Sequence, residues 1–165
     1  NGVETKDTLM SVTYIDLEKG KIKLTRDEIH FSYRSSSFHK KKGMIVGAEF
    51  SLSKRESARQ DQLEIIEYRT ATQPYGEKSA GCIFRNPDDI GAGALIEACG
   101  LKGKRVGDAE VSHLHGNFII NRGEASAQDV MPLIAILKEE IKTQTGRELE
   151  MEVRRVPYQL KDMNV

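Results

Sequence analysis

The spacing of apolar residues near the C-terminus constrains the fold more than any other feature, because it changes from a helical period to a strand period. Between positions 130 and 141, apolar residues recur every three or four positions and so share one helix face. They are Val130, Leu133, Leu137 and Ile141. Ser126 with Asp129 predicts the N-cap of this helix, and Gly146 predicts its end. Pro132 predicts that the regular helix is delayed by one turn.

Residues 148–156 then alternate between apolar and charged side chains, which is the pattern of a strand with one buried face. The apolar face holds Leu149, Met151 and Val153, and the polar face holds Glu148, Glu150, Glu152 and Arg154. A strand is therefore expected directly after the helix.

The first third of the chain predicts mainly strands. Residues 10–24 alternate weakly around Lys19–Gly20 and predict a β-hairpin. Thr25 with Glu28 has the spacing of a capping box, so a short helical turn should follow. Residues 44–52 are mostly apolar and predict a buried strand.

The middle of the chain predicts a helix and then a boundary. Ser53 and Glu56 repeat the capping-box spacing and predict a helix through about Tyr68. The break at residues 72–76 is the expected boundary between two lobes, and a loop rich in small residues follows at 79–87.

The elements beyond this loop complete the fold class. Residues 92–99 predict a short helix ended by Gly100. Val111 and residues 118–120 predict strands around a turn that contains Gly116. Strands and helices are mixed, with hairpin-like pairings, so the class is α+β rather than a doubly wound sheet.

Composition excludes several classes of function. The chain has 165 residues, with 25 basic and 25 acidic side chains, and this balance argues against a nucleic-acid or anionic-membrane surface. The run at 40–42 is more typical of a solvated loop. No apolar run approaches the roughly 18 residues of a membrane-spanning helix. With only two cysteines, Cys82 and Cys99, a disulfide framework is not expected, and reduced thiols in the cytoplasm are. His113 and His115 have no further metal ligands at a suitable spacing, so a metal site is not expected either.

Two stretches carry residues suited to chemistry, and each also fits a plain structural role. Arg34 follows Tyr33 and precedes serines, so its planar fork is placed to bind a carboxylate or simply to lie on the surface. In the stretch at 79–87, small residues allow a ligand close to the backbone beside Cys82. A buried structural cysteine explains the same stretch equally well.

A third candidate is Glu152, on the polar side of the predicted last strand and two residues from Arg154. On an exposed sheet face such alternation is commonplace, so local sequence alone favours the structural explanation.

Taken together, six stretches in a fixed order resemble the UDP-N-acetylenolpyruvoylglucosamine reductase family. They are Phe31–Ser36, Arg69–Pro74, Ser79–Pro87, Gly100–Arg105, Val111–Asn121 and Leu149–Arg154. Each stretch is weak evidence, but the set is specific and covers most of the chain. The short interval between Arg34 and Arg69 resembles the shorter subgroup, which lacks an insertion in the second domain.

The resemblance implies a flavin-dependent oxidoreductase of peptidoglycan synthesis, and thus of cell shape and division. FAD is reduced by NADPH, and a hydride then passes to the enolpyruvyl group of a UDP-sugar. Arg34 and Glu152 match the residues that stabilise the resulting enolate-like species, where a fixed cation is needed. Cys82 stands where the family usually has a serine proton donor, and a thiol, with a reference pKa of about 8.5, suits that role.

The resemblance also implies binding residues. The expected substrate contacts are Tyr33, Arg69, Tyr75, Arg85 and Asn86, and Arg154 matches an arginine near the flavin.

The implied lobes follow the same comparison. Residues 1–71 are expected to end an FAD-binding (VAO/PCMH-type) lobe, 72–147 to form a small α+β UDP-sugar lobe, and 148–165 to return toward the flavin. Because the chain opens on Asn1 and not methionine, we expect a fragment whose partner is the N-terminal half of the same protein.

Two alternatives stay open. A non-catalytic UDP-sugar-binding module would explain the Cys82 substitution, although it would not need both Arg34 and Glu152. Another flavin oxidoreductase with the same FAD domain is the third hypothesis, and the stretch at 79–87 speaks against it.

Overall fold

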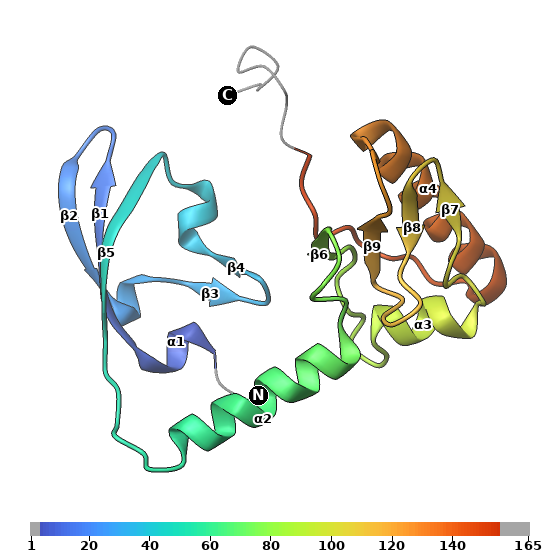
Figure 1. Ribbon diagram of the computed structural model, residues 1–165. Helices are drawn as coiled ribbons and strands as arrows, with labels where there is room; N and C mark the ends of the chain where they lie inside the picture. The colour runs from blue at the N-terminus through green and yellow to red at the C-terminus, as the bar shows by residue number, and fades with distance from the viewer. Residues whose placement is uncertain (1–3, 156–165) are drawn as a thin grey trace. The chain divides into compact units, whose positions relative to one another are not determined.

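The computed structural model describes residues 4–155. The chain divides into two compact units between Leu63 and Glu64, inside helix α2 (Ala58–Thr72), and each unit is described by itself (Figure 1). The sequence predicted a lobe boundary at the C-terminal end of the same helix.

The first unit is built on an antiparallel sheet with the order β2-β1-β5. Its elements are α1 (Thr5–Thr8), β1 (Leu9–Asp16), β2 (Gly20–Thr25), η1 (Arg26–Glu28), β3 (Phe31–Ser32), β4 (Ser35–Ser36), η2 (Ser37–Lys40) and β5 (Gly43–Phe50). The predicted hairpin is confirmed, and so is the capping box of Thr25 and Glu28 that opens η1. A small core forms around Leu9, Val12 and Ile29.

The prediction that residues 44–52 form a buried strand is half wrong. Strand β5 forms, but its side chains are largely exposed, with Met44 at 61% and Phe50 at 47%. The strand lies at the edge of the sheet, paired only with β1 among the described strands. An apolar run favours an extended strand, but it does not fix how many neighbours cover that strand.

The helix predicted from Ser53 begins later than expected. Helix α2 starts at Ala58 and continues to Thr72, and none of its residues is buried. The chain stays extended past β5, where the Ser51 N–H donates to the Thr8 carbonyl at 2.8 Å. That sheet contact competes with an earlier helical turn, so the Ser53 cap is not used.

The second unit contains a four-stranded antiparallel sheet with the order β6-β9-β8-β7. Its elements are β6 (Ser79–Cys82), α3 (Ala92–Ala98), β7 (Arg105–Val106), β8 (Ala109–Val111), β9 (Phe118–Asn121) and α4 (Ala127–Thr145). Helix α4 packs against β7 and β8, and α3 packs against α4 (Figure 1). The predicted short helix and the two strands around Gly116 are confirmed.

Helix α4 confirms the predicted stripe and both caps. Ser126 and Asp129 form the capping box, Gly146 ends the helix at φ 71°, and Leu133, Leu137 and Ile141 are buried. The predicted delay at Pro132 is wrong, because the helix runs from Ala127 straight through it. Proline removes one N–H bond, and the cap together with the buried stripe compensates for that loss.

The prediction of a last strand at residues 148–156 is wrong, but the predicted burial of its apolar side chains is confirmed. Only an isolated antiparallel bridge joins Met151 to Phe84. Leu149 is nevertheless buried, and Met151 and Val153 pack on the same core. We call the described residues 148–155 the tail. The predicted extent to 156 and the segment through 165 lie outside the described residues.

Two absences hold for the part of the chain that the structure describes. None of its helices combines the length and apolar character needed to cross a membrane. No group of three or more His, Cys, Asp or Glu side chains within residues 4–155 is arranged to hold a metal ion.

Candidate active site

The first unit places Tyr33 and Arg34 at the tip of the β3–β4 hairpin, because Ser32 pairs with Ser35 and leaves these two residues as the turn. Arg34 has φ 54° and is the one non-glycine residue with positive φ among the described residues. This conformation costs an L-residue about 1 kcal/mol. Its guanidinium lies 5.9 Å from the centre of the Tyr33 ring. Strained residues cluster at functional sites, so the turn is a candidate for function.

A pocket of about 300 Å³ opens beside this turn. It is lined by Glu4, Thr5, Lys6, Phe31, Ser32, Arg34, Ser35 and Ser36. Lys6 forms an ion pair with the Glu4 carboxylate, so Arg34, the hydroxyls and the Phe31 ring are the groups that suit a contact with an anionic group carrying an apolar portion.

In the second unit, Cys82 ends strand β6 and pairs with Phe118 of β9. The preceding Gly81 has φ 85°, which is the left-handed region that glycine enters most easily. The Cys82 side chain is half-buried, and its sulfur is not in a disulfide. A partly accessible thiol on a fixed strand end is suited to deliver a proton.

The tail returns to the residues directly after Cys82. The Glu152 N–H donates to the Ile83 carbonyl at 2.8 Å, and the Arg85 N–H donates to the Glu150 carbonyl at 2.9 Å. Glu152 therefore lies across from Ile83, one residue from Cys82 in the register. The tail and the strand end, far apart in the sequence, are brought together by backbone pairing.

Arg85 and Asn86 have partners within the fold. The Arg85 guanidinium forms an ion pair with Glu150 at 3.2 Å, and its Nε is buried without a hydrogen-bond partner among the described residues. Asn86 Oδ1 accepts from the Ala92 N–H at 3.0 Å, at the start of α3. Asn86 thus satisfies the first N–H group of α3 from outside the N-cap position, which Gly91 occupies. This role was not predicted from the sequence, because Asn86 does not stand at the spacing of a capping residue.

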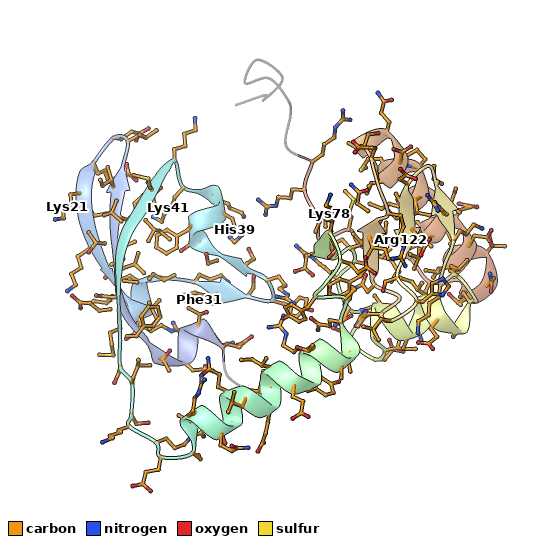
Figure 2. All side chains as sticks on the ribbon, viewed as in Figure 1. Lys21, Phe31, His39, Lys41, Lys78 and Arg122 are labelled. Carbon is orange, nitrogen blue, oxygen red and sulfur yellow. The ribbon has the colours of Figure 1, made fainter. Side chains whose placement is uncertain are left out.

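Arg69 and Tyr75 form a second cluster, at the end of α2. The Arg69 guanidinium lies 5.3 Å from the centre of the Tyr75 ring, a cation–π geometry. An adjacent pocket of about 320 Å³ is lined by Thr70, Gln73, Pro74, Tyr75, Gly76, Glu77, Ser112, His113, Leu114, Ile120 and Arg122. The Arg122 guanidinium, labelled in Figure 2, bonds to both Glu77 and Glu110. Arg122 was not predicted from the sequence, because it has no local signal beyond its charge.

The loop before β9 contains a histidine with a perturbed pKa. Burial, and then the charge of Lys102, hold the pKa of His115 below its usual range, because both disfavour the imidazolium. The Asn117 N–H points at His115 Nδ1 at 3.2 Å, and the ring meets Phe118 edge-on at 4.9 Å. A neutral His115 therefore helps to fix this loop.

The predicted site residues fall in two separate units. Tyr33 and Arg34 belong to the first unit, whereas the other predicted residues belong to the second. Within the second unit, Cys82, Arg85 and Glu152 share one stretch of paired backbone. Arg154, the expected flavin contact, is exposed at the far end of the tail.

Comparisons with known proteins show which family this chain resembles. A family model described as "UDP-N-acetylenolpyruvoylglucosamine reductase, C-terminal domain" matches residues 73–156. The reductase of that name from Protochlamydia amoebophila is 54% identical over 159 residues, covering 96% of this chain and 53% of the relative. Its namesake from Chlamydia muridarum is 48% identical over 155 residues, covering 94% of this chain and 52% of the relative.

A solved structure agrees with these sequence matches. The crystal structure of UDP-N-acetylenolpyruvylglucosamine reductase from Thermus caldophilus matches with a TM-score of 0.79 and 36% identity, over 92% of this chain and 54% of that one. The chain thus spans about half the length of the relatives it matches.

Proposed function

The chain belongs to the UDP-N-acetylenolpyruvoylglucosamine reductase family, and on that premise we propose that it provides the protonating part of such a reductase. The reaction adds a hydride to one carbon of an enolpyruvyl C=C bond and a proton to the other. The substrate is the enolpyruvyl ether of UDP-N-acetylglucosamine, and the product is UDP-N-acetylmuramate for peptidoglycan. We assign the reaction to the cytoplasm, since two reduced thiols suit that compartment.

In this proposal Cys82 is the proton donor. Its S–H transfers a proton to the substrate carbon that carries negative charge, and the thiolate is reprotonated from solvent. The half-buried position at the end of β6 supports this role, because a donor must be fixed and must still reach substrate.

Glu152 and Arg34 are the proposed stabilising residues. Glu152 pairs through its backbone with Ile83, so its position relative to Cys82 is set by the fold of one unit. Arg34 offers a planar fork to the substrate carboxylate from a strained turn. Placement of Arg34 beside the other two residues is part of the proposal.

The family implies FAD and NADPH, and the described residues fit one part of a flavin site. Flavin, when bound, supplies the hydride. The pocket beside Arg34 measures about 300 Å³, at the lower limit for a ligand pocket, and its hydroxyls and Arg34 suit a ring carbonyl or a phosphate, whereas Lys6 is already ion-paired with Glu4. Arg154, on the tail of the second unit, is a further cation, and its side chain is exposed. We propose that these groups contact the flavin, and that most of its site lies in the share of the relatives that this chain does not cover.

Contacts to the UDP portion are proposed for the cationic and aromatic residues. Arg69 and Arg85 suit the diphosphate, Tyr75 offers an exposed ring for stacking, and Tyr33 offers a second ring. Asn86 retains its amide nitrogen for a ligand while its oxygen accepts from the Ala92 N–H at the start of α3.

The observation that carries the proposal is the pairing of Ile83 and Arg85 with the tail. It brings the backbones of Cys82 and Glu152, from distant parts of the sequence, to neighbouring positions. A module that only bound a UDP-sugar would not require this pair.

Binding measurements on this chain test the proposal. Isothermal titration should show tighter binding of the enolpyruvyl UDP-sugar than of UDP-N-acetylglucosamine, and Glu152→Gln should reduce the difference. Equal affinities for the two sugars would instead identify a non-catalytic UDP-sugar module. After addition of FAD and removal of the excess, the visible spectrum tests the flavin contact. A retained flavin calls for a turnover assay with NADPH, whereas a colourless protein limits the chain to substrate binding.

A further inference from the structure

Asn117 is a buried polar side chain, 1% exposed, that bonds to the backbone of a single residue. The Phe84 N–H donates to Asn117 Oδ1 at 2.9 Å, and Asn117 Nδ2 donates to the Phe84 carbonyl at 2.8 Å. The Asn117 carbonyl also accepts from the Ile83 N–H at 2.9 Å. A carboxamide offers the same donor and acceptor as a peptide group. The Asn117 side chain therefore forms with Phe84 the two hydrogen bonds that the backbone of a neighbouring strand would form.

The tail is bonded to the same segment. Ile83 accepts from the Glu152 N–H, and Phe84 forms its bridge with Met151. The segment from Ile83 to Phe84 thus has bonds to Asn117 and bonds to the tail. Cys82 precedes this segment and Glu152 lies across from it, so both take their positions from backbone that Asn117 helps to fix.

Asn117 is itself held by a tightly packed loop. A side chain at Gly116 would come within 2.6 Å of the Gly93 carbonyl of α3. The Asn117 N–H faces His115 Nδ1, and the Phe118 N–H donates to the His115 carbonyl at 3.0 Å. The loop is thus held on both sides of residue 117 by contacts that do not involve Phe84.

We propose that Asn117 is a positioning residue for the Cys82 and Glu152 pair, acting through the backbone of Ile83 and Phe84. The role of that pair in the reaction rests on the proposed function, whereas its positioning does not. Loss of the carboxamide leaves the buried N–H and C=O of Phe84 without partners. The expected consequence is local opening of the segment while the unit stays folded.

The chain offers a matched control at Asn121, at the other end of β9. Its Oδ1 accepts from the N–H groups of Gly123 and Ala125 at 2.9 and 3.0 Å. This carboxamide organises a turn that leads into α4 and has no bond to the stretch from Cys82 to Asn86. Asn117→Asp and Asn121→Asp are therefore the same chemical change, one just before β9 and one at its last residue, with different hydrogen-bond partners.

The experiment measures the rate at which dithiodipyridine modifies each cysteine of this chain, resolved by peptide mass spectrometry. Cys99, at the end of α3, is an internal reference for global loosening. In Asn117→Asp at neutral pH, the carboxylate faces the Phe84 carbonyl in place of a donor, and local opening should raise the Cys82 rate about tenfold. The Cys99 rate should stay within about twofold, and Asn121→Asp should leave the Cys82 rate at its wild-type value.

A pH series separates positioning from a general loss of packing. When the introduced carboxyl group is protonated, it regains an O–H donor and mimics the amide. The ratio of mutant to wild-type Cys82 rates should therefore return toward one at about pH 4. The proposal is overturned if Asn117→Asp leaves the Cys82 rate unchanged, if Cys99 changes in parallel, or if Asn121→Asp has the same effect on Cys82.

Failure of this inference and failure of the proposed function give different results. If Cys82→Ala turns over normally in a complete reductase, the proton-donor role is lost, and the reactivity data on Asn117 still stand. If Cys82→Ala is inactive and Asn117→Asp leaves Cys82 reactivity unchanged, the function stands and the positioning role does not.

Discussion

Leu149 anchors the tail, and its removal should destabilise the second unit and loosen Glu152 together. Leu149 is 2% exposed and lies in the main core of that unit. Leu149→Ala removes about three methylene-sized groups, worth about 2.4 kcal/mol by transfer alone. The residual cavity raises the expected loss to about 3–4 kcal/mol. For a unit of this size, the melting temperature should fall by roughly 10–20 °C.

The matched control is Leu137→Ala. Leu137 is 0% exposed in the same core, but it lies on α4 and not on the tail. Urea unfolding followed by circular dichroism should give similar free-energy losses for the two variants. Hydrogen exchange should then separate them, because Leu149→Ala alone should accelerate exchange at the Glu152 and Arg85 amides, which join the tail to the Cys82 segment.

Two results would refute this reasoning. A loss below about 1 kcal/mol in Leu149→Ala would mean that the leucine does not contribute as a buried core residue. Equal acceleration of the Glu152 amide in both variants would mean that the tail opens only with the whole unit, so that Leu149 does not hold it locally.

Three further predictions concern charge, strain and protonation. Arg147 hydrogen bonds lower the pKa of Asp89, so this pair adds stability above the unfolded-state pKa of about 3.9 and loses it as the pH falls through the lower folded-state value. Asp89→Asn should therefore lower the melting temperature at neutral pH and have little effect in acid; equal effects at both would contradict the pairing. Arg34→Gly should stabilise the first unit by about 1 kcal/mol in urea titrations, since glycine accepts φ 54°, while abolishing turnover in a complete reductase. In that reductase, kcat/KM should fall as Cys82 ionises, Cys82→Ser should remove this alkaline limb, and full activity in Cys82→Ala would exclude the thiol.

Local sequence predicted those elements whose ends and periods are set by neighbouring residues. The caps of α4 at Ser126 and Gly146 need only side chains within a few positions. The hairpin of β1 and β2 likewise follows from alternation around a short turn. The stretch at 79–87 was recognised as a candidate because small residues, a thiol, and Arg–Asn–Pro occur together.

Burial and pairing were decided by contacts between distant residues. The exposure of β5 depends on which elements lie beside it, and an apolar run in the sequence does not identify those elements. Residues 148–156 alternate as a strand does, yet the tail pairs only briefly with Phe84, so its facing was predictable and its hydrogen bonding was not. The partners of Asn86 and Asn117 were likewise decided by the fold. The Asn86 side chain accepts from the N–H at the start of α3, and the Asn117 side chain binds the backbone of Phe84.

The sequence by itself determined helix α4 with its caps, the short helix α3 and the mixture of helices with hairpin-paired strands, because those properties depend on side-chain type and on spacing along the chain. Only the tertiary structure decided that Glu152 lies across from Ile83 beside Cys82, and that Asn117 holds the same segment. The physical reason is that a hydrogen bond between residues far apart in sequence forms only after the intervening chain has folded. Its partners are therefore chosen by packing and not by local pattern.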